Sequence, residues 1–153
     1  MQRRAARAGD EAFLEGLFIS VRREVMAPAG WPEAQLRPFL ADQYRFQQRH
    51  YAVHYAGGMR DIVEQAGAPV GLLHLFTREN EVRVVDIALV PACRNSGLGT
   101  ALLRAVCTAA AARGQSVSLS VALGNPAARL YHRLGFRLAE GGDEIHQRMV
   151  WRP

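Results

Sequence analysis

The first half of the chain carries apolar residues at helical spacing. After Asp10, these residues recur every three or four positions, at Phe13, Leu14, Leu17, Phe18 and Val21. The spacing predicts a helix for which Asp10 is the N-cap. The run APAGWP breaks this helix, and a second helix is predicted from near Pro32 to Tyr55, where the run AGG ends it. A short strand within Met1–Ala8 precedes both helices.

The second half reads mainly as strands with two helices between them. Strands are predicted over 59–65, 70–76, 82–90, 116–123, 135–140 and 145–151. One helix is predicted over Leu98–Arg113 and ends at Gly114, and a short one begins with Asn125 as N-cap and Pro126 as first residue and stops at Gly135. The order β-α-α-β-β-β-α-β-α-β-β predicts an α+β fold, with a mixed sheet and helices on both of its faces.

The composition is that of an ordinary globular domain. The 153 residues are 49% hydrophobic and 22% charged, so we expect a single domain over residues 1–153. The net charge is +5, and all 19 basic residues are arginine. Such a bias is typical of a GC-rich, bacterial-like composition. The charge alone fits a nucleic acid, a membrane surface or a small polyanion equally well.

Cysteines and histidines give no sign of a disulfide framework or a metal site. Cys93 and Cys107 are the only cysteines, which favours a reduced, cytoplasmic protein. His50 and His54 are four residues apart, but no third ligand accompanies them, so no metal is expected. No apolar run is long enough to cross a bilayer or to serve as a secretory signal, and we expect no membrane association.

The stretch VPACRNSGLGT has the residues of an anion-binding turn between a strand and a helix. Gly97 and Gly99 allow backbone conformations and close approaches that a Cβ would block. The amides of Asn95–Thr100 can then converge at a helix N-terminus, and Arg94 adds a forked donor for a diphosphate. A Walker loop is excluded because the chain has no lysine, and a dinucleotide fingerprint would need a small residue at Leu102. An ordinary glycine-rich turn is the alternative.

A second segment, NPAARLYHRLGF, follows one helix and one strand later. Together, ALVPACRNSGLGTALL and NPAARLYHRLGF resemble the GNAT superfamily of N-acetyltransferases. They match its R/Q-x-x-G-x-G/A acyl-CoA loop and its Asn–helix–Tyr–Gly-Phe segment at Arg94, Gly97, Gly99, Asn125, Tyr131, Gly135 and Phe136. Asn95 stands where the family often has a glycine, which requires a compatible backbone conformation.

The resemblance implies a fold and a co-substrate. The fold would be an α/β three-layer sandwich whose mixed, mostly antiparallel sheet of six or seven strands has two splayed parallel strands at its centre. The co-substrate would be acetyl-CoA. The residues expected to bind it are Ala88, Leu89, Val90, Arg94, Asn95, Ser96, Gly97, Leu98, Gly99, Thr100 and Asn125. The amide of Leu89 or Val90 would hold the oxyanion, and Tyr131 would be the general acid for the departing thiolate.

The sequence contains fewer recognisable features for the residues that bind and deprotonate the acceptor. Asp86 interrupts an apolar strand, where a buried charge is costly unless it is paired or functional, so it is the candidate base or amine-binding group. A structural ion pair or a water relay is the alternative. Trp31, Gln47 and Tyr51 are candidates for substrate contacts, and a partly exposed helix face would explain them equally well.

The resulting hypothesis is an N-acetyltransferase that acts on a primary amine of a small molecule or a peptide. The alternatives are a non-catalytic acyl-CoA sensor and a nucleic-acid-binding module on the same fold. Because most of the arginines are scattered along the chain, nucleic acid is not expected as a partner. The family also suggests a homodimer, formed through the last strand.

Overall fold

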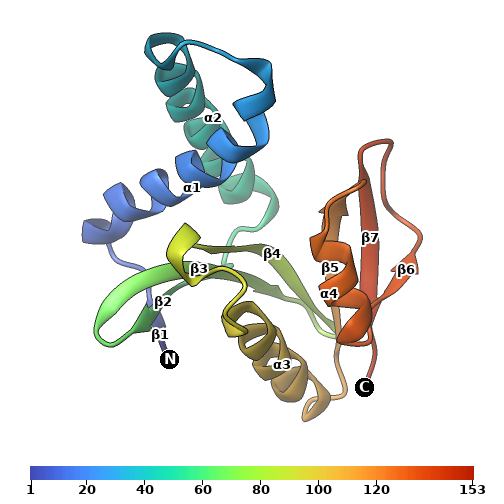
Figure 1. The fold of residues 1–153 in the computed structure, drawn as a ribbon. Coiled ribbons are helices and arrows are strands. Elements are labelled where there is room, and N and C mark those ends of the chain that lie inside the picture. Colours follow the sequence, from blue (N-terminus) through green and yellow to red (C-terminus); the bar gives the residue numbers. More distant parts are fainter. The chain divides into compact units, whose positions relative to one another are not determined.

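The computed structural model describes all 153 residues (Figure 1). The strands are β1 Gln2–Ala5, β2 Met59–Gln65, β3 Ala68–Thr77, β4 Glu81–Leu89, β5 Ser116–Ala122, β6 Arg137–Ala139 and β7 His146–Trp151. The helices are α1 Glu11–Met26, α2 Glu33–His54, α3 Leu98–Ala111 and α4 Ala127–Arg133, with 3₁₀ turns η1 Ala8–Asp10, η2 Ala27–Ala29 and η3 Pro91–Cys93. The predicted order of elements is confirmed.

The seven strands form one mixed sheet in the order β1-β2-β3-β4-β5-β7-β6. β4 and β5 are parallel, whereas β1–β2, β5–β7 and β6–β7 are antiparallel. The parallel register joins Glu81–Arg83 to Ser116–Ser118, while both strands continue beyond it. Splayed strands require a parallel pair that is hydrogen-bonded only at its start, as β4 and β5 are. The predicted fold class is confirmed.

By its contacts, the chain divides into two compact units. The first comprises Met1–Leu73 and Ile87–Cys93, and the second comprises His74–Asp86 and Arg94–Pro153. β3 and β4 therefore contribute residues to both units. That residues 1–153 act as one domain stays a prediction.

The first unit has its core between α1, α2 and β2. Leu14 of α1, Tyr44 of α2 and Ile62 of β2 form one buried cluster, and Phe18 packs its ring 5.5 Å from that of Tyr44. The Tyr44 hydroxyl donates to Glu11 at 2.9 Å. Burial, together with this carboxylate, raises the pKa of Tyr44 to about 12, so the phenol stays neutral in the core.

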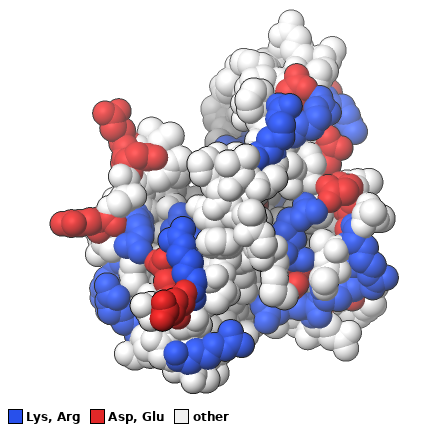
Figure 2. Space-filling view, turned by 180° about the vertical axis from the view of Figure 1, so that it is seen from behind, with Lys and Arg blue, Asp and Glu red and all other residues white.

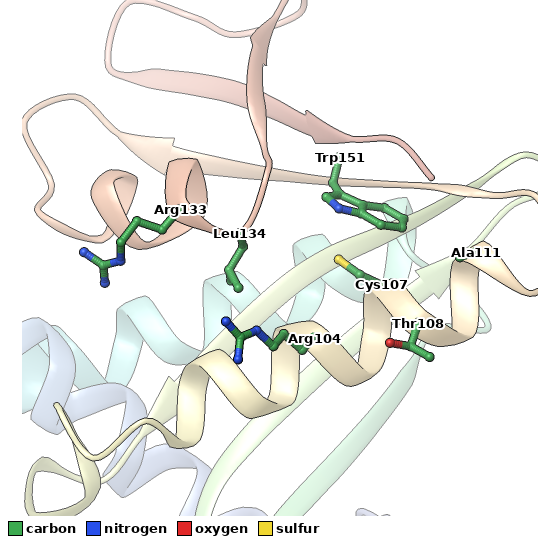
Figure 3. Close-up of a pocket in the computed structure, with 7 residues that line it drawn as sticks. All are labelled: Arg104, Cys107, Thr108, Ala111, Arg133, Leu134 and Trp151. Carbon is green, nitrogen blue, oxygen red and sulfur yellow. The ribbon is translucent and has the colours of Figure 1, made fainter.

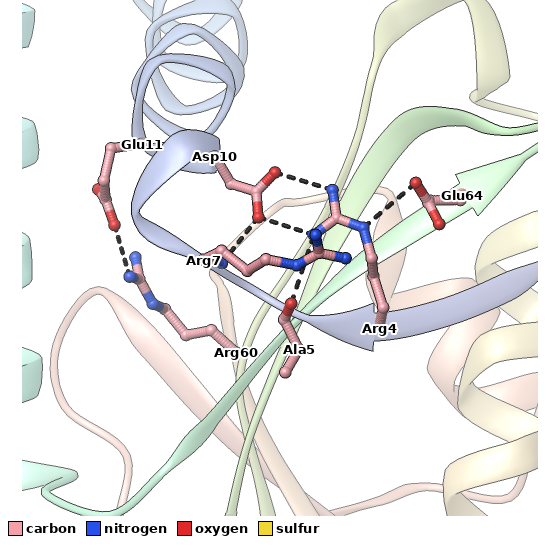
Figure 4. Close-up of polar contacts among 7 residues, drawn as sticks. All are labelled: Arg4, Ala5, Arg7, Asp10, Glu11, Arg60 and Glu64. Carbon is pink, nitrogen blue, oxygen red and sulfur yellow. Dashed lines mark hydrogen bonds and ion pairs between the residues drawn. The ribbon is translucent and has the colours of Figure 1, made fainter.

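A polar network fastens β1 to the start of α1 (Figure 4). The Arg4 guanidinium donates to both oxygens of Asp10 at 2.8 Å, and its Nε lies 3.3 Å from Glu64. The Arg7 amide donates to Asp10 at 2.7 Å. Asp10 is the N-cap residue of α1, as predicted, but its side chain does not cap that helix, because Arg4 and Arg7 occupy the carboxylate.

This network predicts an acid-sensitive stability. The hydrogen bonds from Arg4 and Arg7 hold the pKa of Asp10 well below its usual range, so the folded protein binds fewer protons there than the unfolded chain. The stabilisation is therefore present at neutral pH and is lost as the pH falls below about 4. We expect Asp10→Asn to lower the melting temperature at pH 7 and to flatten its acid dependence.

The measurement is thermal unfolding between pH 7 and pH 2. Asp42→Asn is the matched control, since Asp42 pairs with Arg45 on the exposed surface of α2. An acid dependence of Asp10→Asn that equals that of the wild type would contradict this role of Asp10.

The second unit is organised around α3, which packs on β5 (Figure 1). α3 places an apolar face toward the core, with Leu98, Leu102, Leu103, Val106, Cys107 and Ala110 buried. Glu81 of β4 accepts from Arg148 of β7 at 2.7 Å and pairs with Arg78 at 3.2 Å. Although burial opposes ionisation, the hydrogen bond from Arg148 and the positive charges of Arg148 and Arg78 lower the pKa of Glu81 below its usual value.

Helix ends depart from the predictions by one or two residues. Pro126 is the N-cap of α4 rather than its first residue, and Pro32 likewise precedes α2. The Asn125 side chain nevertheless accepts the Ala127 amide at 2.9 Å and so satisfies a donor at the start of α4. Gly114 has φ +68, as expected of the residue that terminates a helix.

Candidate active site

The turn Arg94–Thr100 leads directly into α3 in the second unit. Asn95 has φ +57 and Gly97 has φ +83, both left-handed, whereas Gly99 already lies in the helix. Asparagine tolerates the left-handed region better than most residues, which explains why it can replace a glycine at position 95. Gly97 is the N-cap, and its carbonyl accepts the Ala101 amide at 3.0 Å.

This geometry leaves donors at the start of α3. The amides of Leu98, Gly99 and Thr100 precede the first intrahelical hydrogen bond, so helix geometry gives them no acceptor within the helix. Together with the helix dipole they form an environment that favours negative charge. Arg94 is half-buried at the beginning of the same turn. The residues present therefore fit a pyrophosphate, and their role in binding it stays a prediction.

Tyr131 of α4 and Asp86 of β4 belong to this same unit. Tyr131 is half-buried and packs its ring 6.0 Å from that of Phe136, which is fully buried. Burial raises the pKa of Tyr131, and the negative charge of Asp86 raises it further. The structure thus brings the two predicted catalytic side chains within electrostatic range of each other. It also keeps the phenol protonated at neutral pH, which a proton donor requires.

The segment Ala88–Val90 lies at the end of β4, in the first unit. Its Val90 amide donates to the Val70 carbonyl of β3 at 2.8 Å. That hydrogen bond engages the Val90 N–H in the main chain. The role of oxyanion donor, expected of the Leu89 or Val90 amide, stays a prediction.

Sequence reasoning missed Gly71, which is buried in β3 directly against this segment. A Cβ at position 71 would lie 2.6 Å from the Ala88 carbonyl oxygen and 2.7 Å from a methyl carbon of Leu89. Only glycine permits so close an approach of the two strands. The available signal was a single glycine inside the strand pattern VGLLHLF, which often marks such a contact.

The three candidate substrate contacts lie in the first unit but do not form one cluster. Trp31 is 43% exposed and packs its ring 5.1 Å from that of Phe39. Gln47 lies eight residues after Phe39 on α2, which corresponds to about 12 Å along the helix axis. Tyr51 contacts Tyr55, with ring centroids 5.8 Å apart. Trp31 thus contacts a part of α2 distant from Gln47 and Tyr51, and the role of all three stays a prediction.

The sequence model of the Acetyltransferase (GNAT) family matches residues 12–136. The chain belongs to this family. The match covers every residue of the Arg94–Thr100 turn together with Asp86 and Tyr131. Membership makes the protein a GNAT acetyltransferase, a class that depends on acyl-CoA. No helix has both the length and the hydropathy needed to span a membrane.

Solved structures of GNAT proteins share this fold at low sequence identity. PaiA N-acetyltransferase from Thermoplasma acidophilum, in complex with coenzyme A, is 15% identical with a TM-score of 0.76, covering 99% of this chain and 98% of its own. A GCN5-related N-acetyltransferase from Rhodopseudomonas palustris is 18% identical, with a TM-score of 0.71. The match covers 99% of this chain and 95% of that protein.

A spermidine N-acetyltransferase chimera, made from SpeG of Vibrio cholerae and hSSAT, is 20% identical, with a TM-score of 0.67. The match covers 99% of this chain and 96% of that protein. At this level of identity the likeness concerns the fold alone. No curated protein matches the sequence significantly.

Proposed function

We propose that this GNAT protein transfers an acetyl group from acetyl-CoA to a primary amine by direct attack of the amine. The observation that carries the proposal is the Arg94–Thr100 turn, where left-handed Asn95 and Gly97 lead into the N-terminus of α3. The phosphates would bind to the amides of this turn and to Arg94. Ala88–Val90 would pair with the pantetheine arm, and Asn125 would contribute at the start of α4.

Bound acetyl-CoA would supply the thioester carbonyl that the amine attacks and the thiolate that leaves. The amide of Leu89 or Val90 would donate to the carbonyl oxygen as negative charge develops on it. Tyr131 would give its proton to the departing sulfur. Asp86 would accept the proton that the amine loses. In this reaction the protein itself would form no covalent bond with the acetyl group.

The role of Asp86 leads to a specific prediction. A general base contributes about 10²- to 10⁴-fold to a rate, so we expect Asp86→Asn to lower kcat/KM for the amine by at least about a hundredfold. The profile of kcat/KM against pH, measured with saturating acetyl-CoA, checks this. Glu79→Gln, an exposed carboxylate in the turn before β4, is the control. If Asp86→Asn reacts within a few-fold of the wild type, a water relay replaces Asp86 as the base.

The acceptor is proposed only by its chemistry, as a primary amine on a small molecule or a peptide. Acceptors can be compared by thiol release from acetyl-CoA with polyamines, amino acids, aminoglycosides, arylalkylamines and peptide N-termini. We expect release above background with at least one class. If acetyl-CoA raises the melting temperature but no amine releases thiol, the protein is an acyl-CoA sensor instead.

Nucleic acid is not supported as a partner. On the face seen in Figure 2, arginines are interrupted by acidic and uncharged residues rather than gathered into one continuous stripe. Nucleic-acid sites are typically lined by clustered basic side chains with aromatic residues among them. A homodimer remains part of the proposal, carried by the family resemblance.

A further inference from the structure

The part of the sheet that belongs to the second unit has one face toward α3 and one polar face. Trp151 of β7 points toward α3, where it lines a cavity together with Cys107 (Figure 3). Trp151 is paired in register with Val117 of β5, which is fully buried, so both side chains lie on the α3 face. Because side chains alternate along a strand, Ser118 and Ser120 of β5 lie on the opposite, polar face.

Arg83 of β4 lies on the same polar face. Its guanidinium donates to the Ser120 hydroxyl at 2.6 Å. The parallel register of β4 and β5 ends with Arg83 opposite Ser118, and Ser120 is two residues beyond this pair. The half-buried Arg83 side chain therefore reaches from β4 to β5 at the point where the backbone pairing of the two strands stops.

The positive charge around Arg83 is only partly balanced. Arg148 of β7 is paired in register with Ser120 and so lies on the same face. The Arg148 guanidinium donates to Glu81 at 2.7 Å, and Glu81 also pairs with Arg78 at 3.2 Å. Arg83, in contrast, donates to a neutral hydroxyl and forms no ion pair with a carboxylate. One carboxylate thus accompanies three guanidinium groups, and the fork of Arg83 suits a further carboxylate.

We propose that Arg83 binds a carboxylate of the acceptor, so that the preferred acceptor carries this group as well as its primary amine. The inference rests on the proposed function, because it places the amine beside Asp86, the proposed base. Asp86 lies three residues after Arg83 on β4, which corresponds to about 10 Å along the strand. The acceptor class is therefore an amino acid in which several bonds separate the amine from the carboxylate.

Acceptors with and without the carboxylate test this preference. The acceptors are β-alanine, γ-aminobutyrate and ε-aminocaproate, and kcat/KM of each is divided by kcat/KM of its neutral amide, which also reports that the enzyme is folded. We expect the wild type to favour the carboxylate in at least one pair, and Arg83→Gln to lower that ratio by about tenfold or more. Arg83→Lys keeps the charge without the fork and should retain part of the ratio. Arg113→Gln, an exposed arginine after α3, is the control and should retain all of it.

A binding measurement separates this inference from the proposed function. Isothermal titration of each amino acid and its amide, with and without coenzyme A, involves no acetyl transfer. We expect the wild type to bind the carboxylate more tightly than the amide, and Arg83→Gln to bind the two equally. If this difference is present but no amine releases thiol, the proposed function fails and the carboxylate site stands. The inference is overturned if neither measurement shows a preference for the carboxylate at any chain length, or if Arg83→Gln keeps the preference as fully as Arg113→Gln.

Discussion

Tyr131→Phe lowers kcat by about 10²- to 10⁴-fold while the KM for acetyl-CoA changes little, if Tyr131 is the general acid. The change removes only the hydroxyl and leaves the ring packed against Phe136, so the loss falls on the proton transfer to the leaving thiolate. Steady-state kinetics with the best acceptor of the amine panel measure both constants. Tyr55→Phe, at the end of α2 in the other unit, is the control and should retain full activity.

The pH dependence provides an independent check on Tyr131. Burial and the Asp86 charge raise the pKa of the phenol above its usual value, and the acid form is the active one. Activity should therefore persist to a higher pH than an ordinary tyrosine, with a pKa of about 10, would allow. A Tyr131→Phe enzyme with undiminished kcat would remove Tyr131 from the mechanism.

Gly71→Ala is expected to raise the KM for acetyl-CoA and to lower kcat, although residue 71 itself is not proposed to touch the substrate. The added Cβ would meet the Ala88 carbonyl oxygen at 2.6 Å, so the Ala88–Val90 segment must shift. Overpacking of this kind costs about 1–3 kcal/mol of stability. Gly71 is in this sense a positioning residue for the segment proposed to bind pantetheine.

Gly16→Ala is the matched control for this substitution. Gly16 lies within α1, and a Cβ there meets nothing within 4 Å. Because alanine favours helix by about 1 kcal/mol over glycine, this variant should be more stable and equally active. Isothermal titration with acetyl-CoA separates the two effects. If Gly71→Ala is destabilised but binds acetyl-CoA as tightly as the wild type, Gly71 has only a structural role.

Features that depend on local sequence could be predicted. Apolar spacing identified α1, and the glycines at positions 97 and 114 identified turns that proved left-handed. The requirement for a compatible backbone conformation at Asn95 came from the family pattern, which often has a glycine at this position. The family resemblance added the splayed parallel strands at the centre of the sheet.

Features that depend on which groups meet in the folded chain could not be predicted. The pairing of the Val90 amide with Val70, and the contact between Gly71 and Ala88, depend on the register of β3 against β4. The Asp10 side chain was expected to cap α1, but a competing guanidinium from Arg4 occupies it. Such outcomes follow from which groups meet in three dimensions, and no periodicity encodes them.

Mass spectrometry of both the protein and the acceptor tests direct acetyl transfer most directly. The protein is incubated first with acetyl-CoA alone and then with acetyl-CoA and the best amine. We predict that the mass of the protein stays unchanged in the first step, and that an N-acetylated amine and free coenzyme A appear in equal amounts in the second. A protein that acquires an acetyl group without acceptor, or an amine panel that yields no amide although acetyl-CoA binds, would contradict direct transfer.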